Sequence, residues 1–483
     1  MVFSDLFFIY AFIPSFALCY LLSYHLDKRH EAEKTGGKDC QLPQMTWKNA
    51  TLIVFSLIFY AWGEPLYVFL MLVSVLINYV CGIMVNKWGK WSLILGVLGN
   101  LLFLGVFKYA GFFANIITQF GYPVPAPDID LPIGISFYTF QSISYLVDVY
   151  RGEAPVQKKF TGLLLYISMF PQLIAGPIVR YNTVAQEINN RKVSVDDFAE
   201  GTYRFFIGLG KKVIFANQFS EIADNFLASG FDNLTTSGAW LGIAAFTLQI
   251  YFDFSGYSDM AIGMGRCLGF HFNENFNHPY CCNSITDFWR RWHISLGSFF
   301  RDYVYIPLGG NRRHQYWNIF VVWGLTGMWH GASWNFILWG LYFGIIVSIE
   351  KFTILKRQDN NHRLLRHVYA MLLVVIGWGI FYFDDLSKMG QFFAISFGFM
   401  HQWHSFVTES AITDNFWLWI AAVVCCIPTR RWLSDKATQL LHTNWLRESS
   451  FTLCRITFTL LMLVVCTALL VGATNNAFIY TRF

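Results

Sequence analysis

Long apolar runs recur along the whole sequence, and no other feature constrains the fold as strongly. A helix needs about 20 apolar residues to cross the hydrocarbon core of a bilayer. The chain is 55% hydrophobic and only 13% charged, whereas about one quarter of the residues of a soluble domain are charged. We therefore predict an all-α polytopic membrane protein with about 11–13 membrane-embedded helices. The candidate spans are 4–24, 50–63, 66–86, 91–117, 131–149, 161–180, 237–263, 316–349, 367–383, 416–428 and 452–473.

Other stretches leave the number of helices open. The stretch 316–349 is too long for one upright helix, so we expect a break at Gly324, Gly327 or Gly331, or two separate segments. The first apolar run begins at Leu6 with no basic region before it, and we expect it to remain as a span rather than to be a cleaved signal peptide. Three stretches are ambiguous: 197–217, 285–308 and 388–400.

The distribution of charge predicts orientation and excludes some functions. Lys and Arg gather in loops 25–48, 350–366 and 429–451, and such loops favour the cytoplasmic side. The N-terminus is then expected outside. The net charge of +5 is small, and without a dense basic patch or an RNA-binding motif we predict no nucleic-acid partner. The cysteines lack metal-ligand spacing, so we predict neither a disulfide nor a metal site.

The best internal boundary lies at the basic loop that follows residue 350. No tandem repeat and no long Gly/Ser linker divides the chain. We expect residues 1–350 to carry the motif-rich core and residues 351–483 to supply transmembrane helices that complete the bundle.

A first cluster of polar residues lies within the apolar region 131–151. Pro132 and Gly134 disfavour a straight continuous helix there. Ser136 and Gln141 can line a polar path, because polar groups inside a membrane are costly and often functional. Hydrogen bonding between helices explains them equally well.

A second cluster combines acidic residues with an Arg- and Trp-rich stretch. Asp253 follows an apolar run and needs a partner or water. It can orient a histidine or form an ion pair with Arg290 or Arg291. The stretch 287–312 also holds His293, and its arginines suit the capture of an anionic donor. A helix at the membrane interface would explain the same arginines without catalysis.

The third cluster surrounds His330, which lies in the middle of an apolar stretch. Burial favours a neutral imidazole, and a neutral imidazole can accept a proton from a hydroxyl. Gly327 and Gly331 thin the helix, so that a substrate chain could approach closely. A structural pairing of His330 is the alternative. Three neighbours are predicted to line a tunnel: Trp329, Trp334 and Asn335.

At these clusters the sequence resembles the membrane-bound O-acyltransferase family, and most of all its bacterial alginate O-acetylase branch. The D-alanyl-lipoteichoic-acid transporter and peptidoglycan O-acetyltransferase branches share the same blocks. The resemblance covers roughly residues 1–350. The matching blocks are FYAWGEP at 59–65, LPIGISFYTFQSISYLVDVYRGE at 131–153, QLIAGPIVRY at 172–181, FDFSGYSDMAIGMGRCLGF at 252–270, FWRRWHISLGSFFRDYVYIPLGGNR at 288–312 and TGMWHGASWNFILWGLYFG at 326–344.

The resemblance implies a fold and a set of site residues. The fold would be a ring of helices around a thin core with a tunnel that reaches a histidine. The family's principal histidine maps onto His330 and its second histidine onto His293. His330 would be the general base, and His293 would orient the donor or hold its thioester. Asp253 would tune this network. Three arginines would bind phosphates of the donor: Arg290, Arg291 and Arg301.

The resemblance also implies the partners. We expect no bound cofactor; acetyl-CoA or an acyl carrier protein thioester would be the donor, on the cytoplasmic side of a bacterial inner membrane. An extracytoplasmic SGNH-type acetyltransferase would complete transfer to a polysaccharide. The predicted function is therefore O-acyl transfer, most of all O-acetylation of an extracytoplasmic polysaccharide. The alternatives are export of D-alanyl or other acyl groups, and a non-catalytic transporter or scaffold of a polysaccharide machine.

Overall fold

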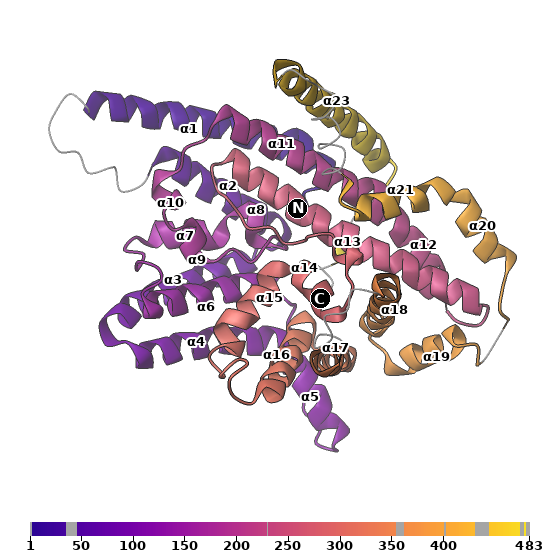
Figure 1. Ribbon diagram of the computed structural model, residues 1–483. Coiled ribbons are helices and arrows are strands. Elements are labelled where there is room, and N and C mark those ends of the chain that lie inside the picture. The colour runs from indigo at the N-terminus through magenta and orange to yellow at the C-terminus, as the bar shows by residue number, and fades with distance from the viewer. Residues whose placement is uncertain are drawn as a thin grey trace. The chain divides into compact units, whose positions relative to one another are not determined.

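The computed structural model describes residues 2–34, 46–228, 230–353, 362–399, 402–429, 444–473 and 478–479 (Figure 1). Every regular element in these ranges is helical, which confirms the all-α prediction. The chain divides into two compact units, which are described separately below. The first holds Met1–Phe205, Asp259–Asn273 and Leu470–Thr481; the second holds Phe206–Ser258, Glu274–Leu469 and Arg482–Phe483.

The first unit is built mainly from the N-terminal helices. Pro171 contributes to a break after α7, because proline has no N–H to continue the helical ladder. One span was predicted over 161–180; that prediction is wrong, since two short helices stand there instead. The elements are η1 (Phe8–Phe12), α1 (Ile13–Lys34), α2 (Trp47–Gly63), α3 (Tyr67–Trp88), α4 (Lys90–Leu104), η2 (Gly105–Tyr109), α5 (Ala110–Gln119), α6 (Ile135–Arg151), α7 (Phe160–Ser168), α8 (Phe170–Leu173), α9 (Tyr181–Val184) and α10 (Glu187–Asn190).

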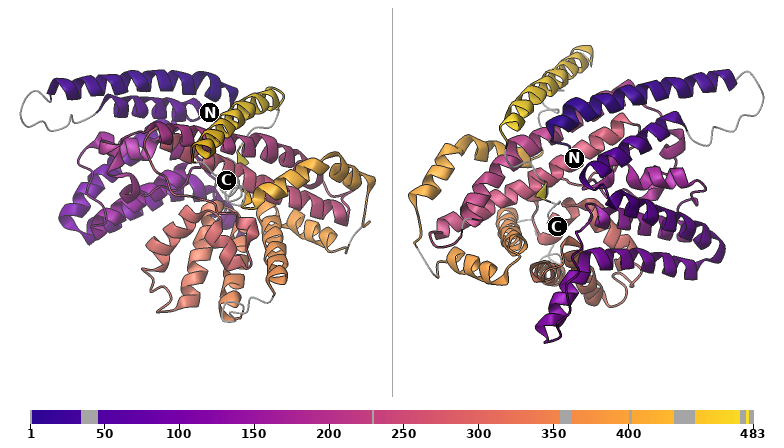
Figure 2. Two further views of the ribbon diagram at one scale, coloured as in Figure 1. Left: turned by 45° about the horizontal axis from the view of Figure 1, so that its top comes forward. Right: turned by 180° about the vertical axis from the view of Figure 1, so that it is seen from behind.

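The second unit contains the motif-rich stretches. Helices α11 (Val195–Gly210) and α13 (Thr236–Cys267) have residues in both units. Helices α16, α17 and α18 lie side by side (Figures 1 and 2). The remaining elements are η3 (Lys211–Ala216), α12 (Asn217–Leu227), η4 (Pro279–Cys281), α14 (Ile285–Arg291), α15 (Ile294–Phe300), η5 (Arg301–Tyr305), α16 (Gln315–His330), α17 (Trp334–Phe352), α18 (Arg363–Tyr382), α19 (Leu386–Ser396), α20 (Phe406–Asp414), α21 (Phe416–Cys426) and α23 (Asn444–Val471).

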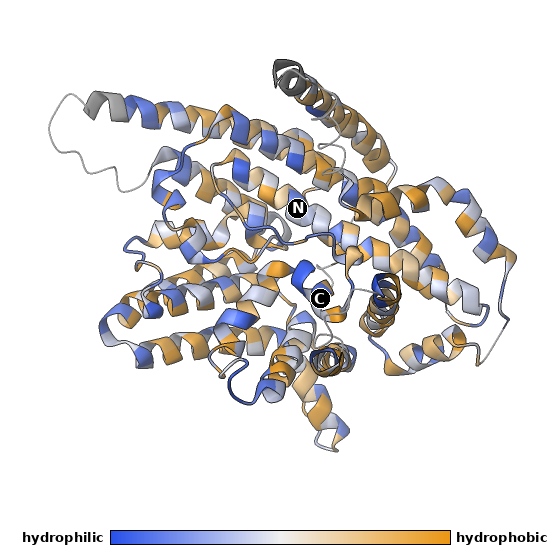
Figure 3. Cartoon of the chain, in the orientation of Figure 1, coloured by the Kyte–Doolittle hydropathy of each residue, from blue (hydrophilic) through white to orange (hydrophobic). Residues whose placement is uncertain are grey.

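Six helical stretches in the described part of the chain are long and apolar enough to cross a membrane. Hydrophobic residues are spread along these helices (Figure 3). The ambiguous stretch 285–308 forms three short elements rather than a span, because the chain leaves helical geometry at Trp292 and His293. The six stretches are Phe8–His30, Tyr67–Trp88, Lys90–Gln119, Trp334–Phe352, Arg363–Tyr382 and Ser450–Val471.

The loops predicted to be cytoplasmic lie partly outside the described residues, at 35–45, 354–361 and 430–443. The predicted orientation therefore stays a prediction. The division at residue 350 also stays a prediction, since the two units are drawn from interleaved segments of the chain.

Two asparagines pair between helices α3 and α4 in the first unit. Asn78 Nδ2 donates to Asn100 Oδ1 at 3.0 Å, and Asn100 Nδ2 donates to Asn78 Oδ1 at 2.7 Å. Each amide also donates to a carbonyl of its own helix, at Ser74 and Gly96. Both side chains are buried. The pair joins two apolar helices through polar groups that satisfy each other, as expected where no water is available.

Asn78→Leu is expected to lower the stability of the protein in detergent by about 1–2 kcal/mol, because it leaves Asn100 without its reciprocal partner. The double variant Asn78→Leu/Asn100→Leu should recover part of this loss, since no unpaired amide remains. Thermal unfolding followed by tryptophan fluorescence measures both. A double variant less stable than the sum of the two single changes would contradict the pairing.

Candidate active site

His330 lies at the bend of a hairpin formed by α16 and α17. Helix α16 ends at His330, Gly331 and Ser333 are extended, and α17 begins at Trp334. The predicted interruption of 316–349 is thus confirmed, with two helices in place of one. The bend follows from sequence, because Gly331 has no Cβ and a Cβ there would collide with the Phe336 ring.

The two helices of the hairpin touch through their backbones. A Cβ added at Gly340 would lie 3.2 Å from the Cα of Gly327 and would collide with the Trp323 carbonyl. The space beside Gly327 is filled by the Phe336 carbonyl in the same way. The glycines were expected to make room for a substrate chain. The structure corrects this: they make room for α17.

His330 is enclosed by aromatic rings. Its side chain is 4% exposed. The ring centroid lies 4.9 Å from Trp329, 4.9 Å from Trp339 and 5.2 Å from Phe381. The contacts with Trp339 and Phe381 are perpendicular, at 79° and 82°. Three aromatic rings therefore pack directly against the imidazole.

His293 is the second buried imidazole of the unit and has different neighbours. It stands between α14 and α15, is 2% exposed, and adopts a left-handed backbone with φ 43° and ψ 55°. Its Nδ1 lies 3.1 Å from Asn275 Oδ1, and its ring packs at 4.6 Å against Phe254. Burial lowers the pKa of His293 to about 3, so the ring is neutral at physiological pH.

The indole of Trp329 connects the two histidines. Its ring centroid lies 5.7 Å from that of His293 and 4.9 Å from that of His330. The residues predicted as catalytic from two separate motifs therefore contact one common side chain. Trp329 itself is buried, and its predicted place in a tunnel wall stays a prediction.

A buried carboxylate holds the start of the helix that precedes His293. Glu350, on α17, accepts hydrogen bonds from Ile285 N at 2.7 Å, Thr286 N at 2.8 Å and Thr286 Oγ1 at 2.7 Å. A carboxylate is well placed at a helix N-terminus, where unpaired N–H groups and the helix dipole favour negative charge. Glu350 thus ties α14, and with it the segment leading to His293, to the α16–α17 hairpin.

Asp253 has a partner other than those predicted. It forms an ion pair with Lys212 at 2.7 Å, and both side chains are almost fully buried. The predicted pairing with Arg290 or Arg291 is wrong: Arg291 Nε pairs with Asp287 at 2.9 Å on its own helix, and Arg290 is exposed. The role of orienting a histidine, considered for Asp253, is filled at His293 by Asn275.

The third predicted arginine is also tied to a neighbour. Arg301 forms two hydrogen bonds with Asp302, at 2.6 and 2.9 Å, and its side chain is 62% exposed. An exposed guanidinium can still meet an anionic ligand. The predicted role of the three arginines in donor binding stays a prediction.

The two residues that begin α17 differ in their surroundings. Asn335 is fully buried, donates from Nδ2 to the carbonyl of Phe381 at 3.1 Å, and accepts from Ser333 Oγ. It joins the hairpin bend to the end of α18. Trp334 is 47% exposed. The prediction that both residues border the substrate stays a prediction.

Ser136 and Gln141 belong to the first unit, on α6. Lys108 Nζ lies 3.4 Å from Ser136 Oγ. The side-chain amide of Gln141 is buried and has no hydrogen-bond partner among the described residues. Tyr138 and Ser142 lie on the same helical face as Gln141. Their hydroxyls are also buried and have no hydrogen-bond partner among the described residues. The polar path predicted along this face stays a prediction.

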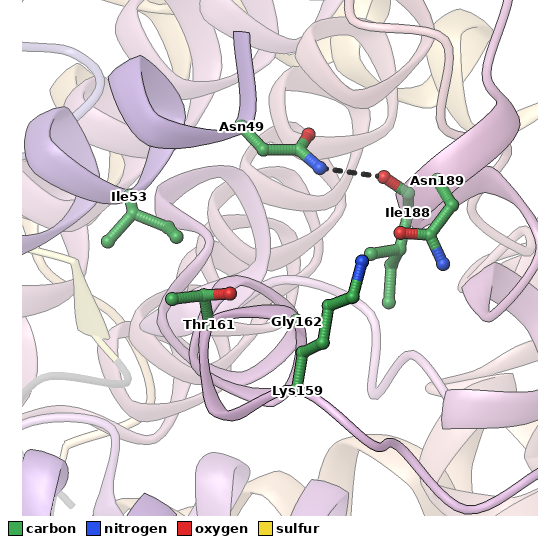
Figure 4. Close-up of a pocket in the computed structure, with 7 residues that line it drawn as sticks. All are labelled: Asn49, Ile53, Lys159, Thr161, Gly162, Ile188 and Asn189. Atoms are coloured by element: carbon green, nitrogen blue, oxygen red, sulfur yellow. Dashed lines mark hydrogen bonds between the residues drawn. The ribbon is translucent and has the colours of Figure 1, made fainter. Parts of the chain in front are cut away.

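The first unit also contains a small pocket (Figure 4). Asn49 Nδ2 donates to the Ile188 carbonyl at its edge, at 2.9 Å. No predicted site residue lines it. The lining residues are Asn49, Ile53, Lys159, Thr161, Gly162, Ile188 and Asn189.

Sequence reasoning missed Asn275, Glu350 and Lys212. Glu350 stood at the end of an apolar run as a lone carboxylate, which was the one available signal. Nothing in the loop sequence around Asn275 separates it from its neighbours Asn273 and Asn277.

The model of the membrane-bound O-acyltransferase family matches residues 159–390. The probable alginate O-acetylase AlgI of Azotobacter vinelandii is 42% identical over 414 residues, which cover 83% of this chain and 78% of that protein. The peptidoglycan O-acetyltransferase of Helicobacter pylori is 36% identical over 392 residues, 73% of this chain and 70% of that protein.

A more distant similarity covers part of the chain. The teichoic acid D-alanyltransferase of Bacillus subtilis is 30% identical over 234 residues, which are 46% of this chain and 59% of that protein. All three relatives are named for the transfer of an acyl group.

Glu350→Gln is expected to destabilise the protein by about 1–3 kcal/mol, because an amide cannot accept three hydrogen bonds at the start of α14 as a carboxylate does. Glu409→Gln is the matched control, since this carboxylate is 62% exposed in the same unit. Thermal unfolding in detergent compares the two. Equal midpoints for both variants would show that Glu350 does not hold α14.

The buried neutral state of His293 predicts a dependence of stability on pH. Its pKa falls from 6.5 to about 3 on burial, so between these values the unfolded chain binds a proton that the folded chain does not. Stability is therefore lost as the pH falls through this window. His293→Gln should flatten that part of the curve, whereas the exposed control His404→Gln should keep the wild-type slope. An unchanged slope in His293→Gln would contradict a buried neutral ring.

Proposed function

This chain belongs to the membrane-bound O-acyltransferase family, and from that premise we propose that it transfers an acetyl group from a thioester donor for O-acetylation of a polysaccharide. It is a multi-pass membrane protein and an acyltransferase. The proposal concerns the acyl group, the donor, the acceptor and the catalytic residues.

The observation that carries the proposal is the contact of two buried imidazoles with one indole. His330 and His293 both pack against Trp329. Burial favours the neutral form of His293, and a neutral imidazole can accept a proton near neutral pH. A buried neutral base is needed for an alcohol acceptor, whose own pKa is far too high for it to react unaided.

The reaction needs only removal of a proton and correct positioning of the two reactants, because a thioester is already activated. His330 removes the proton of the acceptor hydroxyl as the oxygen attacks the thioester carbonyl carbon. The new C–O bond forms, the C–S bond breaks, and the thiolate leaves. The imidazolium then gives its proton to the thiolate, so that the products are an ester and a thiol and the base is restored. Holding both reactants in place supplies much of the remaining rate.

Several neighbours are assigned roles in this proposal. His293 lies close to the reacting groups, and Trp329, Trp334 and Asn335 border the substrate. Arg290, Arg291 and Arg301 bind phosphates of the donor. Asp253, held by Lys212, acts on the site through the packing of α13 rather than through contact. Ser136 and Gln141 contact substrate from α6. Residues 1–350 form the catalytic core in this proposal, although the family match extends to residue 390.

The donor and acceptor follow from the chemistry and from the relatives. The donor is acetyl-CoA or an acetylated carrier protein on the cytoplasmic side of a bacterial inner membrane. The acceptor pathway ends on an extracytoplasmic polysaccharide, with an SGNH-type acetyltransferase as partner. The relatives that cover most of this chain are named for O-acetylation of alginate and peptidoglycan, which favours acetyl over D-alanyl transfer.

His330→Ala is expected to abolish O-acetylation of the surface polysaccharide, with a loss of at least about 10²-fold, because general base catalysis is removed. The test complements a deletion strain and measures ester-bound acetate by mass spectrometry of the isolated glycan. His404→Ala is the matched control, because its ring is exposed in the same unit.

Both variants must reach the membrane in wild-type amounts, which immunoblotting of membrane fractions checks. Normal acetylation by His330→Ala at wild-type abundance would overturn the proposal. Detection of ester-bound D-alanine in place of acetate would leave His330 as the proposed base but would change the proposed acyl group to D-alanyl. Intact transfer after substitution of both His330 and His293, together with loss of complex assembly in the deletion strain, would favour a scaffold.

A further inference from the structure

Asn275 forms hydrogen bonds with several groups around His293. It is fully buried in the loop that follows α13. Its Nδ2 donates to Ser258 Oγ on α13 at 3.0 Å. Its Oδ1 accepts from Ser295 N at 3.2 Å and from Ser295 Oγ at 2.8 Å, and faces His293 Nδ1 at 3.1 Å. One amide therefore joins α13, α15 and the imidazole.

These contacts determine which nitrogen of His293 carries the proton. The backbone N–H of Ser295 can only donate, so the amide atom it meets is the oxygen of Asn275. An oxygen facing Nδ1 can only accept. Nδ1 of His293 therefore carries the hydrogen, and Nε2 of the neutral ring carries a lone pair.

The backbone holds the same arrangement. His293 has a left-handed φ of 43°, which is costly for a residue with a Cβ. Two backbone hydrogen bonds bracket it: Ile294 N donates to the Asn275 carbonyl, and Asn277 N donates to the Arg291 carbonyl, both at 2.9 Å. Non-glycine residues keep such a conformation where the surroundings fix it, and this occurs most often at functional sites.

Nε2 of His293 is the atom that this arrangement leaves for chemistry. It is buried and has no hydrogen-bond partner among the residues that the structure describes. With a lone pair it can accept a hydrogen bond from an O–H or S–H group. It cannot donate one to a thioester carbonyl.

We propose that Asn275 is the positioning residue that holds His293 in the Nδ1–H form, so that Nε2 accepts a hydrogen bond from the acyl-accepting hydroxyl as the acceptor binds, before His330 takes that proton in the transfer step. This inference rests on the proposed function and refines it: His293 serves the acceptor side of the reaction rather than the donor carbonyl. Asn275 acts through His293 and does not itself touch substrate.

Other titratable groups near His293 have partners of their own. On α13, Asp253 pairs with Lys212; on α14, Asp287 pairs with Arg291. His330 lies across Trp329, and the exposed residues Glu274 and Arg290 flank the segment. Burial is the cause of the lowered pKa of His293, with no charged neighbour contributing. A charge placed at residue 275 would therefore be a new influence on the ring.

Asn275→Asp introduces a negative charge at this position in a side chain of nearly the same shape as asparagine. A carboxylate can accept from Nδ1–H as the amide does, but it stabilises the imidazolium and raises the pKa of His293. The acid limb of the pH profile of transfer is then expected to move to higher pH by about 1–3 units. At alkaline pH the Asp variant should regain activity, whereas Asn275→Ala should remain at least about tenfold slower at every pH.

The assay uses membrane vesicles containing the full chain and its partners, with acetyl-CoA labelled in the acetyl group. Incorporation of label into base-labile ester is measured from about pH 5 to pH 9 and divided by the amount of folded protein. Asn318→Ala is the matched control, since Asn318 is also a buried asparagine of the second unit and its Nδ2 donates to the carbonyls of Gly310 and Arg313. It should lower the amount of folded protein and keep the wild-type pH midpoint.

A second measurement requires no variant at residue 275. In wild-type protein labelled with ¹⁵N-histidine, the ring nitrogens of His293 report the tautomer by NMR, with His293→Gln used for assignment. A protonated Nδ1 and an unprotonated Nε2 are expected. The opposite tautomer, or an Asn275→Asp profile with the wild-type midpoint, would overturn the positioning role.

Different results would overturn the proposed catalytic function and the proposed role of Asn275. Wild-type transfer by both His293→Gln and His330→Ala would remove the proposed catalytic function, and Asn275 would have no base to position. Loss of transfer in His293→Gln together with an unshifted Asn275→Asp profile would overturn the role of Asn275 and leave the acyltransferase proposal intact.

Discussion

The close crossing of α16 and α17 is the contact on which the candidate site depends. Backbone meets backbone at Gly327 and Gly340, because neither residue has a Cβ. The bend that joins the two helices is then short, and it leaves His330 at the end of α16 among the rings of both helices. Larger residues at this crossing would separate the helices and displace the imidazole together with its aromatic neighbours.

Several buried polar groups in this apolar unit are arranged in satisfied sets. Lys212 neutralises Asp253, and Glu350 accepts three hydrogen bonds at the start of α14. Asn275 uses its oxygen and its nitrogen. Pairing is expected, because an unpaired buried charge or amide costs several kcal/mol. Nε2 of His293 has no hydrogen-bond partner among the described residues, whereas the other nitrogen of the same ring is held by Asn275.

Sequence patterns predicted the parts of this protein that depend on local composition. Apolar runs predicted the helical class, and the long run 316–349 with its glycines predicted the break beside His330. Contacts between distant residues were beyond such patterns. Asp253 had several cations within its motifs, and only the fold selects Lys212. Likewise, Asn275 lies 18 positions before His293. The hydrogen bond between them depends on a loop whose sequence has no periodic pattern that would predict it.

The two histidines are similar in burial, yet their surroundings suit different parts of one reaction. His293 is held by a neutral amide, which orients the ring without stabilising a charge on it. His330 lies within about 5 Å of two perpendicular aromatic rings, and such rings attract a cation through their faces. That attraction is weak while the imidazole is neutral and grows when it takes a proton. In the proposed function, where His330 is the base, this attraction would favour the transition state over the resting state. On this argument the aromatic enclosure suits His330 to carry the transient charge, and Asn275 suits His293 to align the hydroxyl that supplies the proton.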